Sequence, residues 1–153
     1  MNEAMHEVRA DEMRPALYVV ATPIGNLADI TLRALGVLKC VAAIAAEDTR
    51  VAKKLLDRHG INARLISVHA HNERMAAGKV IELIAAGQPV ALITDAGTPA
   101  ISDPGAELVA HVRAAGHAVV TIPGPCAAVA ALTLAGLPTD RFLFCGFLPS
   151  KEK

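Results

Sequence analysis

The sequence predicts an α/β fold in which a five-stranded, mainly parallel sheet is flanked by helices. Three observations support this prediction. Short apolar runs alternate along the chain with longer stretches whose apolar residues recur at helical spacing. Hydrophobic residues make up 53% of the chain but aromatic residues only 3%, so the core is expected to be aliphatic, as is typical of buried parallel strands. Loops rich in glycine and proline follow three of the apolar runs.

The apolar runs are the predicted strands. The first run is apolar throughout, which favours a central position where both faces of the strand are covered. The alternation of strand and helix favours parallel pairing with right-handed crossovers. The predicted strands are residues 17–21, 41–46, 65–68, 90–95 and 118–122.

A helix is predicted after each strand. Asp29 is suited to cap the first helix, and Asp48 or Thr49 the second. Asp103 followed by Pro104 is the pattern of an N-cap with proline in the first helical position, which predicts a helix start there. The predicted helices are residues 29–39, 49–58, 75–86 and 104–115, followed by an alanine-rich helix that could hold Pro125 in its first turn and runs to about residue 135. The last four end near Gly60, Gly87, Gly116 and Gly136.

The totals bound the domain organisation. The 153 residues are enough for one compact domain. We expect residues 1–15 to be a disordered lead-in, residues 16–148 to form one α/β domain, and residues 149–153 to have the composition of a linker. The net charge is zero, so the chain lacks the excess of basic residues that is typical of a protein that only binds nucleic acid.

The cysteines and the hydropathy indicate the cellular compartment in which the protein is expected. Cys40, Cys126 and Cys145 are far apart and odd in number, so they form no metal pattern and no disulfide framework. This favours a reducing cytoplasm. No apolar run is long enough to span a membrane, so no membrane partner is expected.

Three loops have the character of a ligand site. They follow Ala21, Asp95 and Ile122 and consist mostly of small and turn-forming residues. Gly97 removes a side chain where a ligand could lie against the backbone. Loops at the carboxyl ends of parallel strands are where open α/β sheets bind ligands, so we expect the three to converge. An ordinary turn between strand and helix is the alternative for each loop taken alone.

The residue types in these loops indicate the kind of ligand. The chain has no Gly-x-Gly-x-x-Gly fingerprint, no phosphate loop and no Gly-x-Ser-x-Gly elbow. The carboxylates of Asp95 and Asp103 flank one loop and would repel a polyphosphate. They suit a neutral or positive ligand with hydroxyl and amine groups, and S-adenosylmethionine is one member of that class.

Two other patterns leave alternatives open. Arg50, Lys54 and Arg58 recur at helical spacing, which is typical of a solvated helix face but would also fit a phosphate backbone. His69 and His71 could share a face and bind a metal, but no third ligand is suggested nearby, so a polar or substrate-orienting loop is favoured and no metal is expected.

Six stretches carry a family resemblance that covers nearly everything after residue 16. The chain resembles the tetrapyrrole methylase superfamily, and most closely its ribosomal RNA small-subunit methyltransferase I branch, which methylates the 2′-hydroxyl of a cytidine in small-subunit ribosomal RNA. The most specific stretch is residues 94–105, and Cys126 stands where many relatives have serine. The stretches are residues 17–31, 45–50, 69–73, 94–105, 123–128 and 136–142.

The resemblance implies a cofactor site for S-adenosylmethionine on the three loops. Pro23 would line its entrance. Asp95, Gly97 and Thr98 would hold the methionine part or the ribose. Cys126 and Ala127 would contact the adenosyl part through backbone groups. In the family the cofactor lies in the cleft between this domain and a second α/β domain. The resemblance therefore implies that residues 16–148 are the cofactor-binding α/β domain and that residues 149–153 begin a linker to an absent second domain.

Transfer of a methyl group to a hydroxyl benefits from a general base. The candidates are Glu47, Asp48, His71 and Asp103, and nothing in their spacing chooses among them. A base in the second domain and a reaction without a base are the alternatives. The resemblance also suggests that Arg50 contacts an RNA phosphate.

The resemblance implies an enzyme that methylates small-subunit ribosomal RNA, of which this chain is the N-terminal half. One alternative is a methylase of a small tetrapyrrole-like substrate. Another is a binding or dimerisation fragment that is inactive alone. The expected partners are small-subunit ribosomal RNA or the assembled subunit, and a second copy in a homodimer, with the apolar segment 142–147 as a candidate contact.

Overall fold

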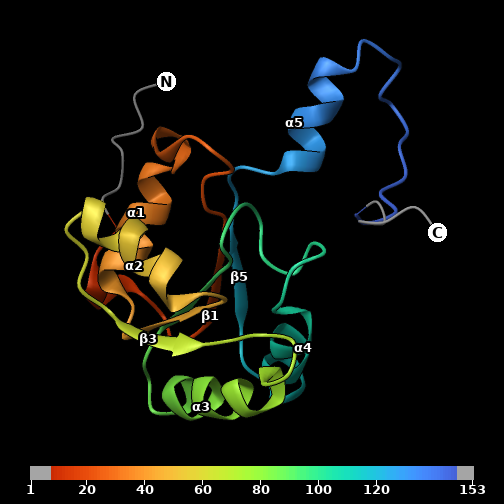
Figure 1. Ribbon diagram of the computed structural model, residues 1–153. Helices are drawn as coiled ribbons and strands as arrows, with labels where there is room; N and C mark the ends of the chain where they lie inside the picture. The colour runs from red at the N-terminus through yellow and green to blue at the C-terminus, as the bar shows by residue number, and fades with distance from the viewer. Residues whose placement is uncertain (1–7, 148–153) are drawn as a thin grey trace.

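A five-stranded parallel sheet lies at the centre of the chain in the computed structural model, which describes residues 8–147 (Figure 1). The strand order is β3-β2-β4-β1-β5, and all four pairings between neighbouring strands are parallel. The predicted fold class is therefore confirmed. The strands are β1 (Leu17–Val20), β2 (Ala43–Ala46), β3 (Arg64–Ser67), β4 (Val90–Ile93) and β5 (Val119–Ile122).

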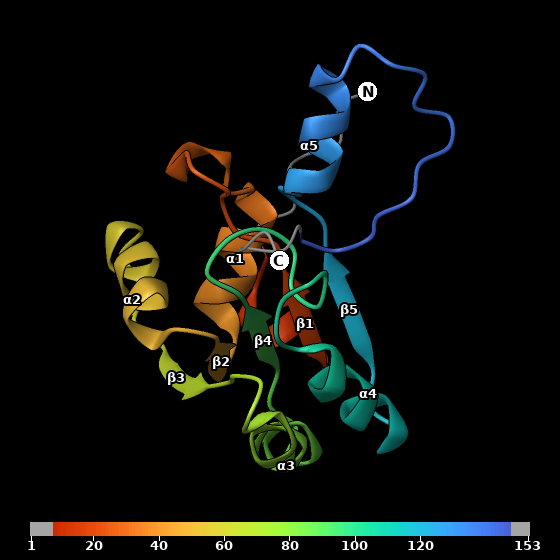
Figure 2. The ribbon, with the colours of Figure 1, turned by 45° about the vertical axis from the view of Figure 1, so that its right-hand side comes forward.

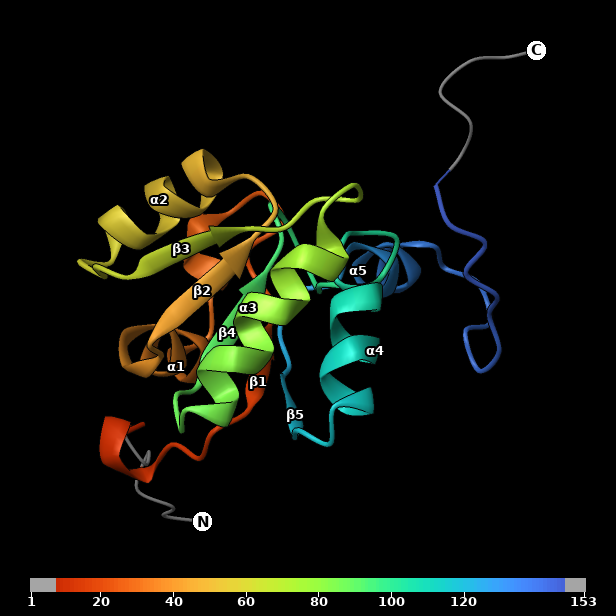
Figure 3. The ribbon, with the colours of Figure 1, turned by 90° about the horizontal axis from the view of Figure 1, so that it is seen from below.

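Four helices cover the two faces of the sheet in pairs, α1 with α2 and α3 with α4 (Figure 3). Side chains of a strand alternate between its faces, so Tyr18 and Val20 pack toward α1 and α2 while Leu17 packs toward α3 and α4. The helices are α1 (Leu32–Cys40), α2 (Thr49–Arg58), α3 (Glu73–Ala85), α4 (Ala106–Ala114) and α5 (Ala127–Leu134), and short 3-10 turns occupy Ala10–Glu12 and Leu27–Asp29.

The two central neighbours β4 and β1 define the place where a ligand is expected. The chain leaves the carboxyl end of β1 toward α1 on one face and leaves β4 toward α4 on the other. Diverging connections of this kind open a crevice at the sheet edge, and open α/β folds bind ligands there. Every residue of β4 is buried, so the strand places the loop that follows it firmly.

The structure corrects the predicted start of the fourth helix. We expected Asp103 and Pro104 to begin it, but α4 begins at Ala106, after Gly105. Gly105 has a φ of +120°, and no side chain next to it in sequence caps the helix. Asp103 instead belongs to the loop, where its carboxyl reaches a cavity described below.

The C-terminal part of the described chain differs from the sheet (Figure 2). Helix α5 projects away from the strands and has no buried residue. The apolar segment 142–147, named above as a candidate dimer contact, has no regular secondary structure, and Phe142, Leu143 and Phe147 are exposed. No helix among residues 8–147 combines the length and apolar character needed to cross a membrane.

Part of the predicted lead-in, residues 8–15, contacts the domain. Val8 and Met13 are half-buried against the cluster under α1 and α2. Residues 1–7 and the predicted linker 149–153 lie outside the described residues. The domain boundaries stay predictions.

Candidate functional site

Three loops meet at the carboxyl edge of the sheet, as the sequence predicted. Thr22 follows β1 and Gly97 follows β4, and they exchange two backbone hydrogen bonds of 2.9 and 3.1 Å. Thr98 donates a hydrogen bond from its hydroxyl to the carbonyl of Pro125, in the loop after β5, at 3.0 Å. Direct bonds therefore join all three loops.

Glycine at position 97 is needed for this convergence. Its φ of +85° lies in the left-handed region, where a side chain is strained. A Cβ there would lie 3.3 Å from Cγ2 of Ile24 and 3.8 Å from the carbonyl oxygen of Pro125. The absence of a side chain lets the loop after β4 pass between the other two.

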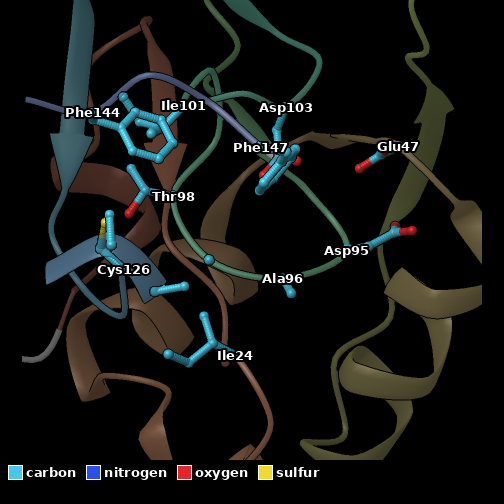
Figure 4. Close-up of a pocket in the computed structure, with 13 residues that line it drawn as sticks. Ile24, Glu47, Asp95, Ala96, Thr98, Ile101, Asp103, Cys126, Phe144 and Phe147 are labelled. Atoms are coloured by element: carbon cyan, nitrogen blue, oxygen red, sulfur yellow. The ribbon is translucent and has the colours of Figure 1, made fainter. Parts of the chain in front are cut away.

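The three loops and the segment after α5 enclose a cavity of about 420 Å³ (Figure 4). This volume lies in the range of small-molecule sites, about 300–1,000 Å³. The lining side chains are apolar, small or acidic, and none is basic. They are Ile24, Glu47, Asp95, Ala96, Gly97, Thr98, Ile101, Asp103, Cys126, Ala127, Ala128, Phe144 and Phe147.

Five of the six residues predicted to hold the cofactor line this cavity, namely Asp95, Gly97, Thr98, Cys126 and Ala127. Pro23 does not. It is buried and lines a separate cavity of about 250 Å³ on the side of α2. Because Asp95 lines both cavities, the cavity that Pro23 lines is adjacent to the larger one. The cofactor roles of all six residues stay predictions.

Two carboxyl groups of the cavity wall are shifted toward their neutral form. Burial raises the pKa of Glu47, and the nearby charge of Asp95 raises it further. Burial also raises the pKa of Asp103, and the Asp95 charge adds to the effect. The Thr94 hydroxyl lies near Asp103 and offsets part of that rise in pKa, although it completes no hydrogen bond within residues 8–147.

Asp48 lies at the same edge but in a different environment. Its carboxylate accepts hydrogen bonds from Nε and an Nη of Arg50, at 3.1 and 2.7 Å. These bonds lower the pKa of Asp48 to about 2, so it holds its proton far less tightly than Glu47 or Asp103. The backbone N–H of Asp48 donates to Oδ1 of Asp95 at 3.1 Å, which ties the loop after β2 to the cavity wall.

His71, the fourth candidate base, is exposed and is not among the cavity-lining residues. Its ring and that of His69 lie edge to face, with centroids 6.2 Å apart. Asn72 shapes this loop, because its side chain accepts from the His69 N–H and donates to the Ser67 carbonyl. Within the described residues, no group of three or more histidine, cysteine, aspartate or glutamate side chains is arranged to hold a metal ion.

Sequence reasoning missed three features of the site. Thr22, which is buried, donates from its hydroxyl to the Thr94 carbonyl at 3.2 Å and so joins the loops after β1 and β4. Glu73 is buried and accepts the backbone N–H of Leu108, in the first turn of α4, at 3.1 Å. Phe144 and Phe147 line the cavity, although their apolar character had suggested only a dimer contact. No local sequence pattern marks any of these contacts, because each joins residues far apart in the chain.

Comparisons with known proteins agree with this geometry. The family model of tetrapyrrole (corrin/porphyrin) methylases matches residues 16–151. The chain is 57% identical over 144 residues to a ribosomal RNA small subunit methyltransferase I of Escherichia coli O157:H7, and 57% over 135 residues to that of Pseudomonas aeruginosa. These matches cover 94% and 88% of this chain but 50% and 48% of the relatives, so the chain spans about half their length.

Among solved structures, a uroporphyrin-III-C-methyltransferase from Thermus thermophilus is similar, with a TM-score of 0.60 and 27% identity. The superposition covers 82% of this chain and 53% of that one.

Proposed function

We propose a function from one premise, that this chain belongs to the tetrapyrrole methylase family. Methyltransferases of this family depend on S-adenosylmethionine, so the cofactor is the one expected from the sequence. We infer that the cavity of about 420 Å³ is the site of that cofactor. The observation that carries this inference is the direct bonding of the three loops around the cavity.

The lining residues fit this group by their chemistry. S-adenosylmethionine carries a sulfonium and an ammonium cation, and the cavity wall has three carboxyl groups and no basic side chain. Asp95 would hold the methionine part or the ribose, together with Gly97 and Thr98. Small residues on the opposite wall, Cys126 and Ala127, leave room for a flat adenine ring against the backbone.

The proposed reaction is methylation of the 2′-hydroxyl of a cytidine in small-subunit ribosomal RNA, with this chain as the N-terminal half of the enzyme. The relatives named for ribosomal RNA support an RNA acceptor, at 57% identity. A small tetrapyrrole-like acceptor is the second candidate, supported by the uroporphyrin enzyme at 27% identity. RNA or the small subunit, and a second copy of the chain, are the proposed partners, and the cytoplasm the proposed location.

When bound, S-adenosylmethionine supplies a methyl group that its positive sulfur has already activated. The chain's own contribution is alignment, which can lower a barrier by about 7–11 kcal/mol in well-fitted cases. A carboxylate on the wall also accepts the proton of the acceptor hydroxyl. Glu47 and Asp103 are the two candidates with the right position and a raised pKa, which makes each a better proton acceptor than an ordinary carboxylate.

The other two candidate bases fit less well. Asp48 is paired with Arg50 and has a pKa near 2, so it is a weak proton acceptor. His71 does not line the cavity. Arg50 stays a proposed RNA contact, with its charge partly balanced by Asp48.

The test is Asp95→Asn in the full-length protein that contains this chain. The variant keeps an oxygen that can accept the Asp48 N–H but removes the charge, so we expect S-adenosylmethionine affinity to fall by about tenfold or more. Calorimetric titration measures the affinity. The matched control is Asp57→Asn, an exposed carboxylate on α2 outside the cavity, which should bind normally.

Transfer of labelled methyl groups to small ribosomal subunits tests the acceptor. If the full-length protein labels the RNA, the proposed reaction is supported. If neither the full-length protein nor this chain labels the RNA, the proposed reaction is rejected. Unchanged affinity in Asp95→Asn would instead remove Asp95 from the cofactor site.

A further inference from the structure

A second cavity, of about 250 Å³, lies beside the cofactor cavity. The loop after β1, helix α2 and the end of β4 each supply part of its wall. Asp95 is the wall that the two cavities share. A group held in the second cavity therefore lies next to a group held in the first.

The wall of this second cavity is mostly apolar. Pro23, Leu27, Val51 and Leu55 supply aliphatic surface. Leu27 and Val51 are 43% and 37% exposed, so this apolar surface is open to solvent. Thr94 also lines the cavity, and its buried hydroxyl has no hydrogen-bond partner within residues 8–147. Such a site fits a flat, partly polar group.

Lys54 connects this cavity to a basic edge of α2. It lines the cavity and lies four residues from both Arg50 and Arg58, so the three cations share one side of the helix. Arg50 is paired with Asp48. Lys54 and Arg58 form no ion pair with any group of residues 8–147, so their charges are available to an anion.

We propose that the second cavity holds the base of the acceptor nucleotide, while Lys54 and Arg58 hold phosphates of the RNA chain. This rests on the proposed function, in which the acceptor is RNA. Proteins read RNA through unstacked bases held against flat or apolar side chains, and Lys and Arg contacts to phosphates position the strand. A nucleotide held there lies beside the cofactor cavity, because Asp95 lines both cavities.

The size of the cavity favours a nucleotide over a tetrapyrrole. At about 250 Å³ it is smaller than sites for drug-sized ligands, about 300–1,000 Å³. A single pyrimidine ring is compatible with this volume, whereas a macrocycle of four pyrrole rings is not. The basic edge adds charge complementarity to a polyanion, which a lone apolar pocket would lack.

Two matched pairs of variants test the proposal in the full-length protein. Lys54→Ala removes the cation at the cavity, and Lys53→Ala removes its neighbour, which is paired with Asp57 at 3.1 Å. Leu27→Ala shortens the apolar wall, and Leu32→Ala shortens a leucine that is 66% exposed and lines neither cavity. All four side chains are at the surface, so folding should be preserved.

The probe is unmodified small-subunit ribosomal RNA, with binding measured over a salt series. Lys54→Ala should weaken binding about fivefold and reduce the slope of log affinity against log salt by about one. In the methyl-transfer assay, Leu27→Ala should raise the KM for RNA about fivefold. It should leave the slope of log affinity against log salt unchanged. Both variants should bind S-adenosylmethionine like the wild type, and both controls should bind RNA like the wild type.

The outcomes separate this proposal from the function on which it rests. If the wild type methylates the RNA but Lys54→Ala and Leu27→Ala behave like their controls, the acceptor nucleotide lies elsewhere and the proposal is overturned. If Lys54→Ala and Lys53→Ala weaken RNA binding equally, α2 contributes only diffuse charge, which also overturns it. If the wild type neither binds nor methylates the RNA, both the function and this site are rejected.

Discussion

Helices α2 and α4 both begin at the edge of the sheet that carries the candidate site, but they begin in different ways. Helix α2 is capped by its own preceding residue, since the Asp48 carboxylate accepts the N–H of Arg50 at 2.8 Å. Helix α4 follows Gly105, which offers no side chain. Instead, the N–H of Leu108 in the first turn of α4 donates to the buried carboxylate of Glu73, which belongs to α3.

This difference shows which contacts of a site can be predicted from patterns in the sequence. A local cap uses neighbours in the chain, and the preference of helix starts for aspartate makes it visible in the sequence. A cap supplied across the fold depends on how α3 packs against α4, and no local pattern records it. The loop that ends at α4 carries Asp95, Gly97 and Thr98, so this cap from α3 supports the cavity that these three residues line.

The largest expected loss of stability is at Gly105, the residue that precedes α4 in the comparison of the two helix starts. In Gly105→Ala the new Cβ would lie 2.8 Å from Cδ2 of the buried Leu92, at a φ of +120°. We expect a loss of about 3 kcal/mol in the free energy of unfolding, measured by urea denaturation. Gly116→Ala, at a φ of +82° with open space around it, is the control after the other end of α4, and it should cost about 1 kcal/mol. Equal losses would show that the approach of Leu92 is unimportant.

The next effect concerns Glu73. Glu73→Ala leaves the N–H of Leu108 buried without an acceptor, and we expect a loss of about 2 kcal/mol in the free energy of unfolding. Glu73→Gln retains an acceptor oxygen and should recover part of that loss. Hydrogen exchange of the Leu108 amide is the direct measurement, and it should accelerate in Glu73→Ala. Unchanged exchange would mean that α4 starts without help from α3.

A smaller effect is the pH dependence of the cavity wall. Glu47 and Asp103 have a pKa raised by burial, so the folded protein keeps these protons to a higher pH than the unfolded chain does. The free energy of unfolding should therefore fall as pH rises from near 4 through their raised pKa values, and Glu47→Gln with Asp103→Asn should remove this fall. Urea denaturation from pH 4 to 8 measures it, with the exposed Asp29→Asn as control. A double variant that keeps the wild-type slope would contradict this account.

The smallest effect is at Asp48, which lies at the surface with a half-buried side chain and whose pKa is lowered to about 2 by Arg50. Its stabilising effect is present above the usual carboxyl pKa of 3.8 and should fade as pH falls toward 2. Asp48→Ala should lower the thermal midpoint at pH 7 less than Glu73→Ala does, and Asp48→Asn should retain most of the cap. A larger loss in Asp48→Ala than in Glu73→Ala would reverse the comparison between α2 and α4.

Much of the fold could be predicted from the sequence, because its signals are local. All five strands and all five helices were located, and Asp48 was one of the two residues predicted as the cap of α2. The predicted cap of α1 was wrong, because Thr31 and not Asp29 accepts an N–H in the first turn of this helix. The pattern Asp103-Pro104 misled, because an aspartate before a proline is a cap only if the chain turns helical there. Here the chain continues in turns to Gly105, and Asp103 contributes to the cavity wall instead.

The candidate site could be predicted only in part. The convergence of three loops follows from parallel strands having their carboxyl ends at one edge, and Gly97 and Thr98 mark two of the contacts. The position of Pro23 in the neighbouring cavity and the contribution of Phe144 depend on side-chain packing between distant segments. Among the four proposed bases, burial and pairing separate Glu47 and Asp103 from Asp48, and neither property is visible in a linear sequence.

The paired backbone bonds between Thr22 and Gly97 fix one side of the cavity. Because both residues donate and accept, the turns after β1 and β4 must shift together or not at all. Phe144 and Phe147, by contrast, reach the cavity from a stretch without regular structure. Exchange of a small molecule would then proceed past these two rings, so the rate of its release should respond to their bulk more than to any change at the sheet.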